Sequence, residues 1–277
     1  MLSIGAMSGN QSEYYTRLAQ QDYYLSGGEP EGYWRGKGAS AMRLGKLVKP
    51  RVLGRLFHGY SPSNKKLVQN AGKPNRQPGW DLTFSAPKSV SVLWSQADSK
   101  LRNNIQAAHR QAVDKTIEFI EERFAESRVG KGGTERVKAK LVVAAFEHSC
   151  SRALDPQLHT HSLVLNLGVC NDGKVRTITS KDLYRAKMLS GAFYRCELAN
   201  QLISKCGLQL TRPLNNQNAK QAWFEVAGIP LDLVKHFSKR RTQILDSFKA
   251  RGLETVSAAS FAALATRSAK DLVPPRI

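Results

Sequence analysis

The chain has 277 residues, 41% of them hydrophobic, and its 42 lysines and arginines outnumber its 22 aspartates and glutamates by 20. This length and apolar content allow a sizeable core and exclude a chain that is disordered throughout. The excess positive charge favours a polyanionic partner, with nucleic acid ahead of an anionic membrane surface. No apolar run approaches the roughly 20 residues that span a bilayer, and the N-terminus does not resemble a signal peptide. We therefore expect a cytoplasmic protein without membrane insertion.

The first half of the chain predicts strands separated by a basic, irregular segment and followed by a long helix. A short strand is expected at residues 1–7, and the basic segment contains one helix around 51–57. The alternating side chains of residues 80–84 predict another strand, after which 90–94 either continues the sheet or begins a helix. Apolar residues recur every three to five positions through 98–127, which indicates an amphipathic helix.

The second half predicts a hairpin and further helices. The elements expected here are strands at 138–146, 158–169 and 174–179, a long helix at 181–206, a short strand at 223–226, a basic helix from about 231 to 251 and a final helical piece from 257. The turn Asn171-Asp172-Gly173 separates two of the strands. Together, these elements predict an antiparallel sheet with helices, which indicates an α+β fold. We expect one domain over residues 1–277.

Three histidines form the strongest local signal in the chain. His159 and His161 lie two apart on a predicted strand, where residues i and i+2 point to one face. His148 closes the preceding strand, and a hairpin through residues 149–157 brings it to the same face. Three neutral imidazoles are good ligands for a first-row divalent ion and leave coordination positions open for catalysis. The alternative is a set of half-buried polar residues on a sheet. The other histidines are interpreted as structural: His58, His109 and His236.

A carboxylate is expected near the histidines, because a metal-bound imidazole usually donates its second N–H to an oxygen acceptor. Asp81 is a candidate, since it stands in an otherwise apolar strand. Its alternative is an aspartate at a strand start that faces solvent. Asp155 is a rival, but an Asp-Pro pair is more typical of a turn.

Two pairs of adjacent tyrosines stand nine residues apart near the N-terminus: Tyr14-Tyr15 and Tyr23-Tyr24. Aromatic packing or base stacking is the alternative, and it would be preferred if the histidines were absent. With a metal nearby, tyrosine is a covalent nucleophile once its proton is removed. A phosphodiester is a natural electrophile for it, because a metal ion offsets the charge that builds on phosphate oxygens in the transition state.

Basic residues spread through the first third of the chain, with a compact cluster near residue 240, are candidates for phosphate contacts. Any one of them alone is more typical of a solvated surface charge, so the collective excess carries the argument. The candidates for DNA contacts are Arg35, Lys37, Arg76, Lys88, Arg152, Lys239 and Arg240. Trp34, Trp80 and Trp94 are candidates for stacking on splayed bases, although core packing is favoured for at least two of them.

Several runs of residues together resemble a known family. The matching runs are Met1-Leu2-Ser3-Ile4, the paired tyrosines, Trp34-Arg35-Gly36-Lys37-Gly38-Ala39, residues 79–91, and His148 with Ser151-Arg152 and Pro156-Gln157-Leu158-His159-Thr160-His161. In this order they resemble the relaxase domain of TrwC/TraI-type (MobF) conjugative relaxases, members of the HUH endonuclease superfamily. The resemblance covers nearly the whole chain. It implies a palm-like central antiparallel sheet flanked by helices, with a C-terminal helical part that closes over DNA.

The resemblance also implies site- and strand-specific nicking and rejoining of DNA at a plasmid transfer origin, through a 5′-phosphotyrosine intermediate. Tyr14 matches the nucleophile of the initial nick, and Tyr23 matches a tyrosine implicated in a later strand transfer. Tyr15 and Tyr24 occupy the second places of the pairs and support or substitute for them. The spacing between the two pairs varies among such proteins.

The site that the resemblance implies holds a divalent ion on His148, His159 and His161. Asp81 matches a strand aspartate that orients a metal-binding histidine or helps to activate the tyrosine. The family implies that Mg²⁺ or Mn²⁺ supports activity, whereas three imidazoles suit Mn²⁺, Zn²⁺ or another transition metal better than Mg²⁺.

The expected partner is single-stranded DNA of a transfer origin beside a hairpin. By resemblance, a relaxosome accessory protein, a coupling protein and a type IV secretion system are further partners, and the protein is transferred from a bacterial donor to the recipient cell. We expect a monomer, and the N-terminal fragment of a longer relaxase-helicase. The alternatives are an HUH initiator nuclease of rolling-circle replication and a non-catalytic, metal-stabilised DNA-binding module. A metal-dependent hydrolase of small molecules would explain neither the charge nor the tyrosines.

Overall fold

The structure is a computed structural model, and it describes residues 1–9, 12, 16, 31–151, 153–212, 223–240, 242, 243 and 246. The strands are β1 (Leu2–Ala6), β2 (Tyr33–Arg35), β3 (Gly79–Ser85), β4 (Glu126–Val129), β5 (Glu135–Cys150), β6 (Pro156–Cys170), β7 (Val175–Arg176), β8 (Leu210–Thr211) and β9 (Glu225–Val226). The helices are α3 (Lys37–Ala41), α4 (Pro50–Phe57), α5 (Lys88–Gln96), α6 (Ser99–Phe124), the 3₁₀ turn η1 (Lys131–Gly133), α7 (Ser180–Cys206) and α8 (Leu231–His236).

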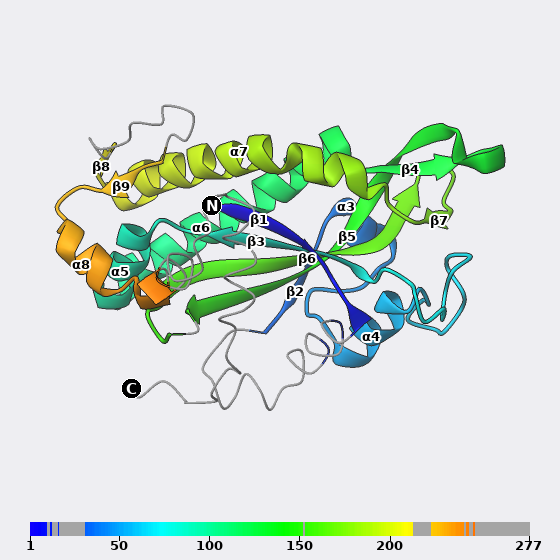
Figure 1. The fold of residues 1–277 in the computed structure, drawn as a ribbon, viewed down its shortest axis with the longest axis horizontal. Coiled ribbons are helices and arrows are strands. Elements are labelled where there is room, and N and C mark those ends of the chain that lie inside the picture. Colours follow the sequence, from blue (N-terminus) through cyan, green and yellow to red (C-terminus); the bar gives the residue numbers. More distant parts are fainter. Residues whose placement is uncertain are drawn as a thin grey trace.

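A central antiparallel sheet organises the described chain. Its strands follow the order β1-β3-β6-β5-β2, with β4 paired to β5 and β7 paired to β6 at the far end (Figure 1). The long strands β5 and β6 form the middle of the sheet, and both extend beyond the predicted strands at 138–146 and 158–169. The predicted α+β fold with a central antiparallel sheet is confirmed.

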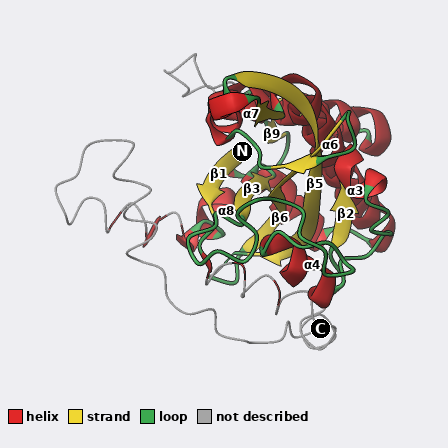
Figure 2. Cartoon of the chain, turned by 90° about the vertical axis from the view of Figure 1, so that its right-hand side faces the viewer, coloured by secondary structure: helices red, strands yellow, loops and turns green. Residues whose placement is uncertain are grey.

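Both faces of the sheet are covered, because the central strands alternate between two apolar cores. Leu141 and Val143 of β5 point to the face on which α6 and α7 pack. Val142, Ala144 and Phe146 point to the opposite face, where α3 and α4 pack. Figure 2 shows the strands between these groups of helices. Adjacent residues of one strand therefore have opposite surroundings, which decides the place of every polar side chain on it.

The two long helices have recognisable ends. Asp98 caps α6 by accepting a hydrogen bond from the Leu101 amide at 2.8 Å, as the preference for aspartate at this position predicts. Gly207 ends α7 in the left-handed conformation, with φ of 64°. No helix in the described part of the chain is both long and apolar enough to cross a membrane.

Three details differ from the sequence expectations. The helix predicted over 98–127 ends at Phe124, because the next residues form β4 and pair with β5 around the glycine turn. The helix predicted from 231 to 251 is wrong as a single element. Its first part, α8, ends at His236, where the Ser238 hydroxyl donates to the Val234 carbonyl after the last turn. Residues 239 and 240 are helical again, and residues 247–251 of the prediction lie outside the described part of the chain. The strand expected at 174–179 shortens to β7. The alternatives at 90–94 resolve to α5, and the helical piece expected from 257 lies outside the described residues.

One polar side chain of α6 is completely buried in the layer between the sheet and α7. The imidazole of His109 is 0% exposed, with Nδ1 2.8 Å from the Tyr194 hydroxyl and Nε2 2.9 Å from the Thr160 hydroxyl. Burial lowers the pKa of His109 from 6.5 to about 4. The ring is therefore neutral near pH 7, with one nitrogen donating and the other accepting a hydrogen bond.

The buried His109 predicts a loss of stability in mild acid. The unfolded chain binds a proton with a pKa of about 6.5, whereas the folded chain does so only at about 4. Stability from this residue is therefore complete above about pH 6.5 and falls as the pH drops toward 4, by about 2 kcal/mol between pH 7 and pH 5. Urea unfolding in EDTA at both pH values measures the loss. The loss of stability in His109→Gln should be smaller than in the wild type by this amount. Burial also keeps His159 neutral, but His159 is present in both proteins, so its contribution cancels in the comparison. Equal losses in the two proteins would show that His109 does not titrate in this way.

Candidate active site

Two neighbouring strands, β5 and β6, bring the three histidines to one end of the sheet. In the pairing of β5 with β6, His148 lies opposite His159. His161, two residues further along β6, points to the same face and lies opposite Thr83 of β3. The histidines lie on the face that carries α3 and α4, because they occupy the same alternating positions of β5 and β6 as the residues buried there. We call His148, His159 and His161 the histidine cluster.

The spacing of the rings fits one metal ion. The centres of the three imidazoles are 5.2 Å apart in each of the three pairs. A nitrogen bound at about 2.1 Å places its ring centre roughly 3.2 Å from an ion, so rings at angles of about 90–110° have centres about 4.5–5.3 Å apart. As the side chains stand, however, no group of three or more His, Cys, Asp and Glu residues in the described part of the chain forms a metal site, and the rings of His148 and His159 are stacked at 23°. The rings thus have the spacing that an ion needs and would turn to complete its coordination.

Hydrogen bonds fix which nitrogen faces the centre of the cluster. Nδ1 of His161 lies 2.8 Å from a carboxylate oxygen of Asp81, and Nδ1 of His159 lies 2.8 Å from the Gln157 carbonyl. Both acceptors require Nδ1 to carry the proton, so the lone pair of each neutral ring is on Nε2. Thr83 donates to the other oxygen of Asp81 at 3.2 Å and holds the carboxylate in place.

Burial keeps His159 in the form that binds a cation. His148 is 4% exposed. The pKa of His159 is well below 6.5, first because burial disfavours its charged form and then because His161 and His148 are close. A neutral imidazole at pH 7 offers its lone pair to a metal ion without first losing a proton.

The carboxylates weighed from the sequence have different surroundings. Asp81 contacts the histidine cluster directly, as described above. Asp155 is 2% exposed and lies in the loop between β5 and β6, where it forms an ion pair with Lys239 at 3.8 Å. Its backbone carbonyl accepts from the Ser151 amide at 2.8 Å, so it belongs to a turn, as its place before a proline suggested.

The predicted tyrosines, Tyr14, Tyr15, Tyr23 and Tyr24, lie outside the described residues. Two positions beside the first pair are described. Ser12 is buried and helical, and the Thr16 hydroxyl donates to the Ser12 carbonyl at 2.8 Å. Thr16 also lines a cavity of about 570 Å³ with Arg51 and His58 of the α4 region. The histidine cluster itself is thus the part of the site that the structure defines.

The basic residues proposed for DNA contacts fall into different environments. Arg35 and Lys37 form ion pairs with acidic residues of α6, Asp114 at 2.6 Å and Glu122 at 2.9 Å. Arg76 is 8% exposed and donates to the carbonyls of Phe57 and Asn166, so its guanidinium supports the fold.

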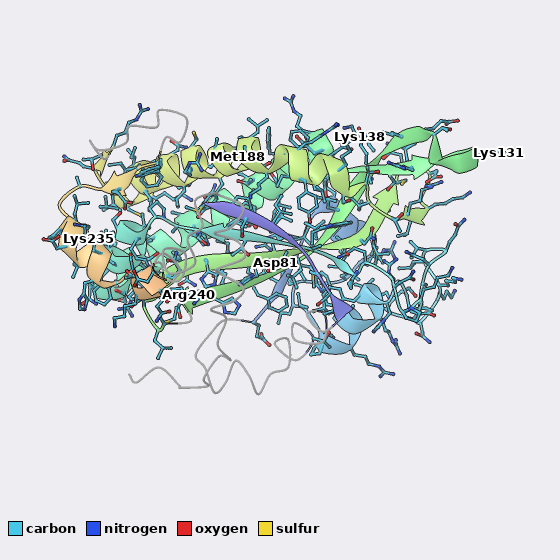
Figure 3. The ribbon with its side chains drawn as sticks, in the orientation of Figure 1. Asp81, Lys131, Lys138, Met188, Lys235 and Arg240 are labelled. Atoms are coloured by element: carbon cyan, nitrogen blue, oxygen red, sulfur yellow. The ribbon has the colours of Figure 1, made fainter. Side chains whose placement is uncertain are left out.

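Three further basic candidates, Lys88, Lys239 and Arg240, lie toward the end of the sheet where β5 meets β6. Lys88 donates to the Pro156 carbonyl at 2.9 Å, and burial lowers its pKa. Lys239 faces Asp155, and Figure 3 labels Arg240 in the same region, whereas Lys131 lies at the opposite end beside β4. Arg152 is outside the described residues. Of the tryptophans, Trp34 and Trp80 are core residues at 5% and 4% exposure.

Sequence reasoning missed Thr83, Gln157 and the polar side chains behind the cluster. Thr83 could have been found, because it lies two residues from Asp81 on a predicted strand and so shares its face. The Gln157 carbonyl is a backbone group, so a pattern of side chains along the sequence does not identify it as a hydrogen-bond acceptor. Contacts from α6 are tertiary, and the helical period alone does not show which strand residues they reach.

Comparison with known proteins agrees with this geometry. Residues 8–276 match the family described as TrwC relaxase. Two curated relatives, both named multifunctional conjugation protein TraI, come from Escherichia coli (strain K12) and Escherichia coli and are 32% and 31% identical over 290 and 286 residues. These alignments include 100% and 99% of this chain but 16% and 15% of the relatives, so the chain spans about one sixth of their length.

Solved structures of a relaxase share the fold. The conjugative relaxase TrwC in complex with oriT DNA, in its metal-bound structure, has a TM-score of 0.84 and 30% identity, covering 99% of this chain and 93% of that one. TrwC with a 27-mer DNA comprising the recognition hairpin and the cleavage site has a TM-score of 0.76 and 30% identity, covering 98% and 91%. A copper-bound structure of TrwC with oriT DNA has a TM-score of 0.81 and 31% identity, covering 98% and 92%. The extent of the family match, together with the histidine cluster and its aspartate, shows that this chain belongs to the TrwC relaxase family.

Proposed function

We propose that this chain nicks and rejoins one strand of DNA at a plasmid transfer origin, by metal-assisted transesterification with a tyrosine nucleophile, and so initiates conjugative transfer. The observation that carries the proposal is the histidine cluster, whose three ring centres are 5.2 Å apart beside Asp81. Family membership supports it, since TrwC structures of the same fold hold oriT DNA and metal.

Each residue of the site has a different part in the proposed reaction. His148, His159 and His161 would hold the ion through their inward nitrogens, and Asp81 keeps the ring of His161 turned toward it. When bound, the ion would act as a Lewis acid on a non-bridging oxygen of the scissile phosphate. Burial and neutral ligands leave the ion's charge available to the phosphate, because no ligand carboxylate cancels it.

Tyr14 is the proposed nucleophile. Its phenolic oxygen bonds to phosphorus, the bond from phosphorus to the 3′-oxygen breaks, the phenol loses its proton and the departing oxygen gains one. The products are a 5′-phosphotyrosine and a free 3′-hydroxyl. Because one phosphodiester replaces another, attack by a 3′-hydroxyl reverses the step and rejoins DNA. Tyr23 would serve a later strand transfer, with Tyr15 and Tyr24 in supporting places.

We propose a divalent transition metal, with Mn²⁺ or Zn²⁺ favoured over Mg²⁺ by ligand chemistry, since Mg²⁺ prefers oxygen ligands. Mg²⁺ remains an expectation from the family. The copper-bound structure of TrwC illustrates how such a relative accepts an ion that binds imidazole strongly.

Single-stranded DNA with an adjacent hairpin is the proposed partner. The TrwC complex with a recognition hairpin supports it, as does the charge of this chain. Residues 32–79 contain eleven lysines and arginines and no aspartate or glutamate. Arg35 and Lys37 pair with acidic residues of α6, and Arg76 binds a backbone carbonyl, which leaves most of that positive charge for phosphates.

The wider setting is likewise proposed from the family. The chain would act in the bacterial cytoplasm as a monomeric relaxase domain, residues 1–277, that belongs to a longer relaxase-helicase and works with a relaxosome accessory protein, a coupling protein and a type IV secretion system. The match to conjugation proteins favours this over an initiator of rolling-circle replication. The two functions are distinguished by comparing covalent adduct formation on a transfer-origin strand with that on a replication-origin strand.

Replacing the nucleophile should abolish covalent chemistry and spare binding. Tyr14→Phe is expected to lower the rate of adduct formation by about 1000-fold or more, because the attacking oxygen is removed. The measurement uses labelled single strands that tile a transfer origin, with and without EDTA, on a denaturing gel. Tyr184→Phe, at an exposed position of α7, is the matched control and should keep the wild-type rate. Adduct from Tyr14→Phe at that rate would assign the nucleophile elsewhere. Wild-type binding without adduct on any strand would support the non-catalytic module.

Removing the charge of Asp81 should weaken the metal site without unfolding the chain. Asp81→Asn keeps the size of the side chain but loses the carboxylate that accepts from His161. We expect the affinity for Mn²⁺ to fall about 10-fold or more. Titration calorimetry measures it, and Asp182→Asn, which removes a carboxylate paired with Arg136 far from the cluster, is the control. An unchanged Mn²⁺ affinity in Asp81→Asn would show that Asp81 does not orient a ligand.

A further inference from the structure

The face of the sheet directly behind the histidine cluster carries buried polar residues, of which Glu147 and Thr160 are bound by α6. Glu147 and Thr160 lie opposite each other in the pairing of β5 with β6, one step from the pair His148 and His159. They are 2% and 0% exposed. Because side chains alternate along a strand, both point toward α6 while the histidines point the other way.

Glu147 is bound from three directions. Arg110 of α6 donates to both of its oxygens, at 2.6 and 2.9 Å. Gln106 of α6 donates at 3.0 Å, and the Tyr33 hydroxyl of β2 donates at 2.7 Å. Burial alone would raise the pKa of Glu147, but these hydrogen bonds outweigh it and lower the pKa to about 2. The carboxylate is ionised and held in one position.

Thr160 is bound from the same turn of α6. Its hydroxyl lies 2.9 Å from Nε2 of His109, whose other nitrogen lies 2.8 Å from the Tyr194 hydroxyl of α7. The surroundings are otherwise apolar, and the rings of Phe84 and Tyr194 are 5.3 Å apart. A buried polar chain of this kind holds its members in fixed geometry, because any displacement leaves a donor or acceptor unpaired.

Three side chains of a single helical turn therefore reach both strands. Gln106, His109 and Arg110 are spaced i, i+3 and i+4, which places them on one side of α6. Two of them hold Glu147 on β5 and the third holds Thr160 on β6. Apolar residues would fill this volume at a lower cost of desolvation, so stability alone does not account for these groups.

The strands need such a restraint at this place. The pairing of β5 with β6 shifts register between His148 and Cys150, at the edge of the cluster, and such an irregularity locally disrupts the ladder of hydrogen bonds. His159 and His161 are the neighbours of Thr160 on either side. A change in the separation or tilt of the two strands would move all three rings relative to one another.

We propose that Glu147 and Thr160, both hydrogen-bonded by one turn of α6, are positioning residues. They hold β5 and β6 in the geometry in which the three imidazoles converge on a metal ion. The inference rests on the proposed metal-binding role of the histidine cluster. It assigns to α6 a part in metal affinity, beyond its part in the core, and acts through preorganisation of the ligands.

Removing the Thr160 hydroxyl tests the proposal. Thr160→Val keeps the shape of the side chain and deletes its bond to His109. We expect the Kd for Co²⁺, read from the visible absorption of the bound ion, to rise about 10-fold or more, with an altered spectrum. Thr160→Ser restores the hydroxyl and should restore both Kd and spectrum. Gln106→Ala, which loosens Glu147 at a half-buried position, is a milder second variant with an expected increase of a few fold.

The matched control is Glu121→Gln. Glu121 is also on α6, is 5% exposed and accepts from the Leu141 amide of β5 at 2.7 Å, six residues along the strand from Glu147. It should change the melting temperature and leave the Kd for Co²⁺ unchanged. If Thr160→Val and Gln106→Ala bind Co²⁺ like the wild type while melting at lower temperature, these residues only stabilise the core, and the proposal is wrong.

The outcomes separate this inference from the proposed function. A wild-type chain that binds Co²⁺ but forms no adduct with any DNA strand would contradict the nuclease and leave the comparison of variants readable. A wild-type chain with no bound-Co²⁺ absorption would overturn the positioning role, because there would be no ion to position ligands for. A raised Kd in Thr160→Val that Thr160→Ser reverses is the supporting result.

Discussion

The pairing of β5 with β6 is the constraint on which the site depends. It places His148 opposite His159, and the two-residue period of a strand carries His161 to the same face. The adjacent pairing of β6 with β3 then sets Asp81 within hydrogen-bond distance of His161. A slip of one residue in either pairing would turn a ligand or its carboxylate to the opposite face, toward α6 and α7. The register of three strands thus creates the chemistry.

The two faces of the sheet contribute in different ways. One face presents the histidine cluster, and the basic segment of residues 32–79, which has no acidic residue, includes the helices packed on that face. The other face packs on α6 and α7 and is apolar except for buried side chains such as Glu147 and Thr160. The basic segment therefore lies on the side of the ligands, while α6 binds Glu147 and Thr160 on the opposite side.

Much of this arrangement could be predicted from the chain itself. The spacing of His159 and His161 on a β-like run predicts their common face, and the lone carboxylate in a strand identifies Asp81. The structure bears out both placements. Elements whose existence depends on a distant partner were less predictable. The residues of β4 are predicted as the end of a helix unless their pairing with β5 is known. The break after His236 depends on local hydrogen bonds that helical periodicity does not indicate.

The sequence by itself determined the periodicities, the ligand types and the charge, because these are properties of residues that lie close together in the chain. The resemblance to relaxases comes from the same local runs. Only the tertiary structure decided that Asp81, 80 residues before His161, binds that ring, and that one turn of α6 reaches both strands behind the cluster. Such contacts are set by how the helix layer packs on the sheet. The pairing of strands and helices over long separations is a property of the whole fold.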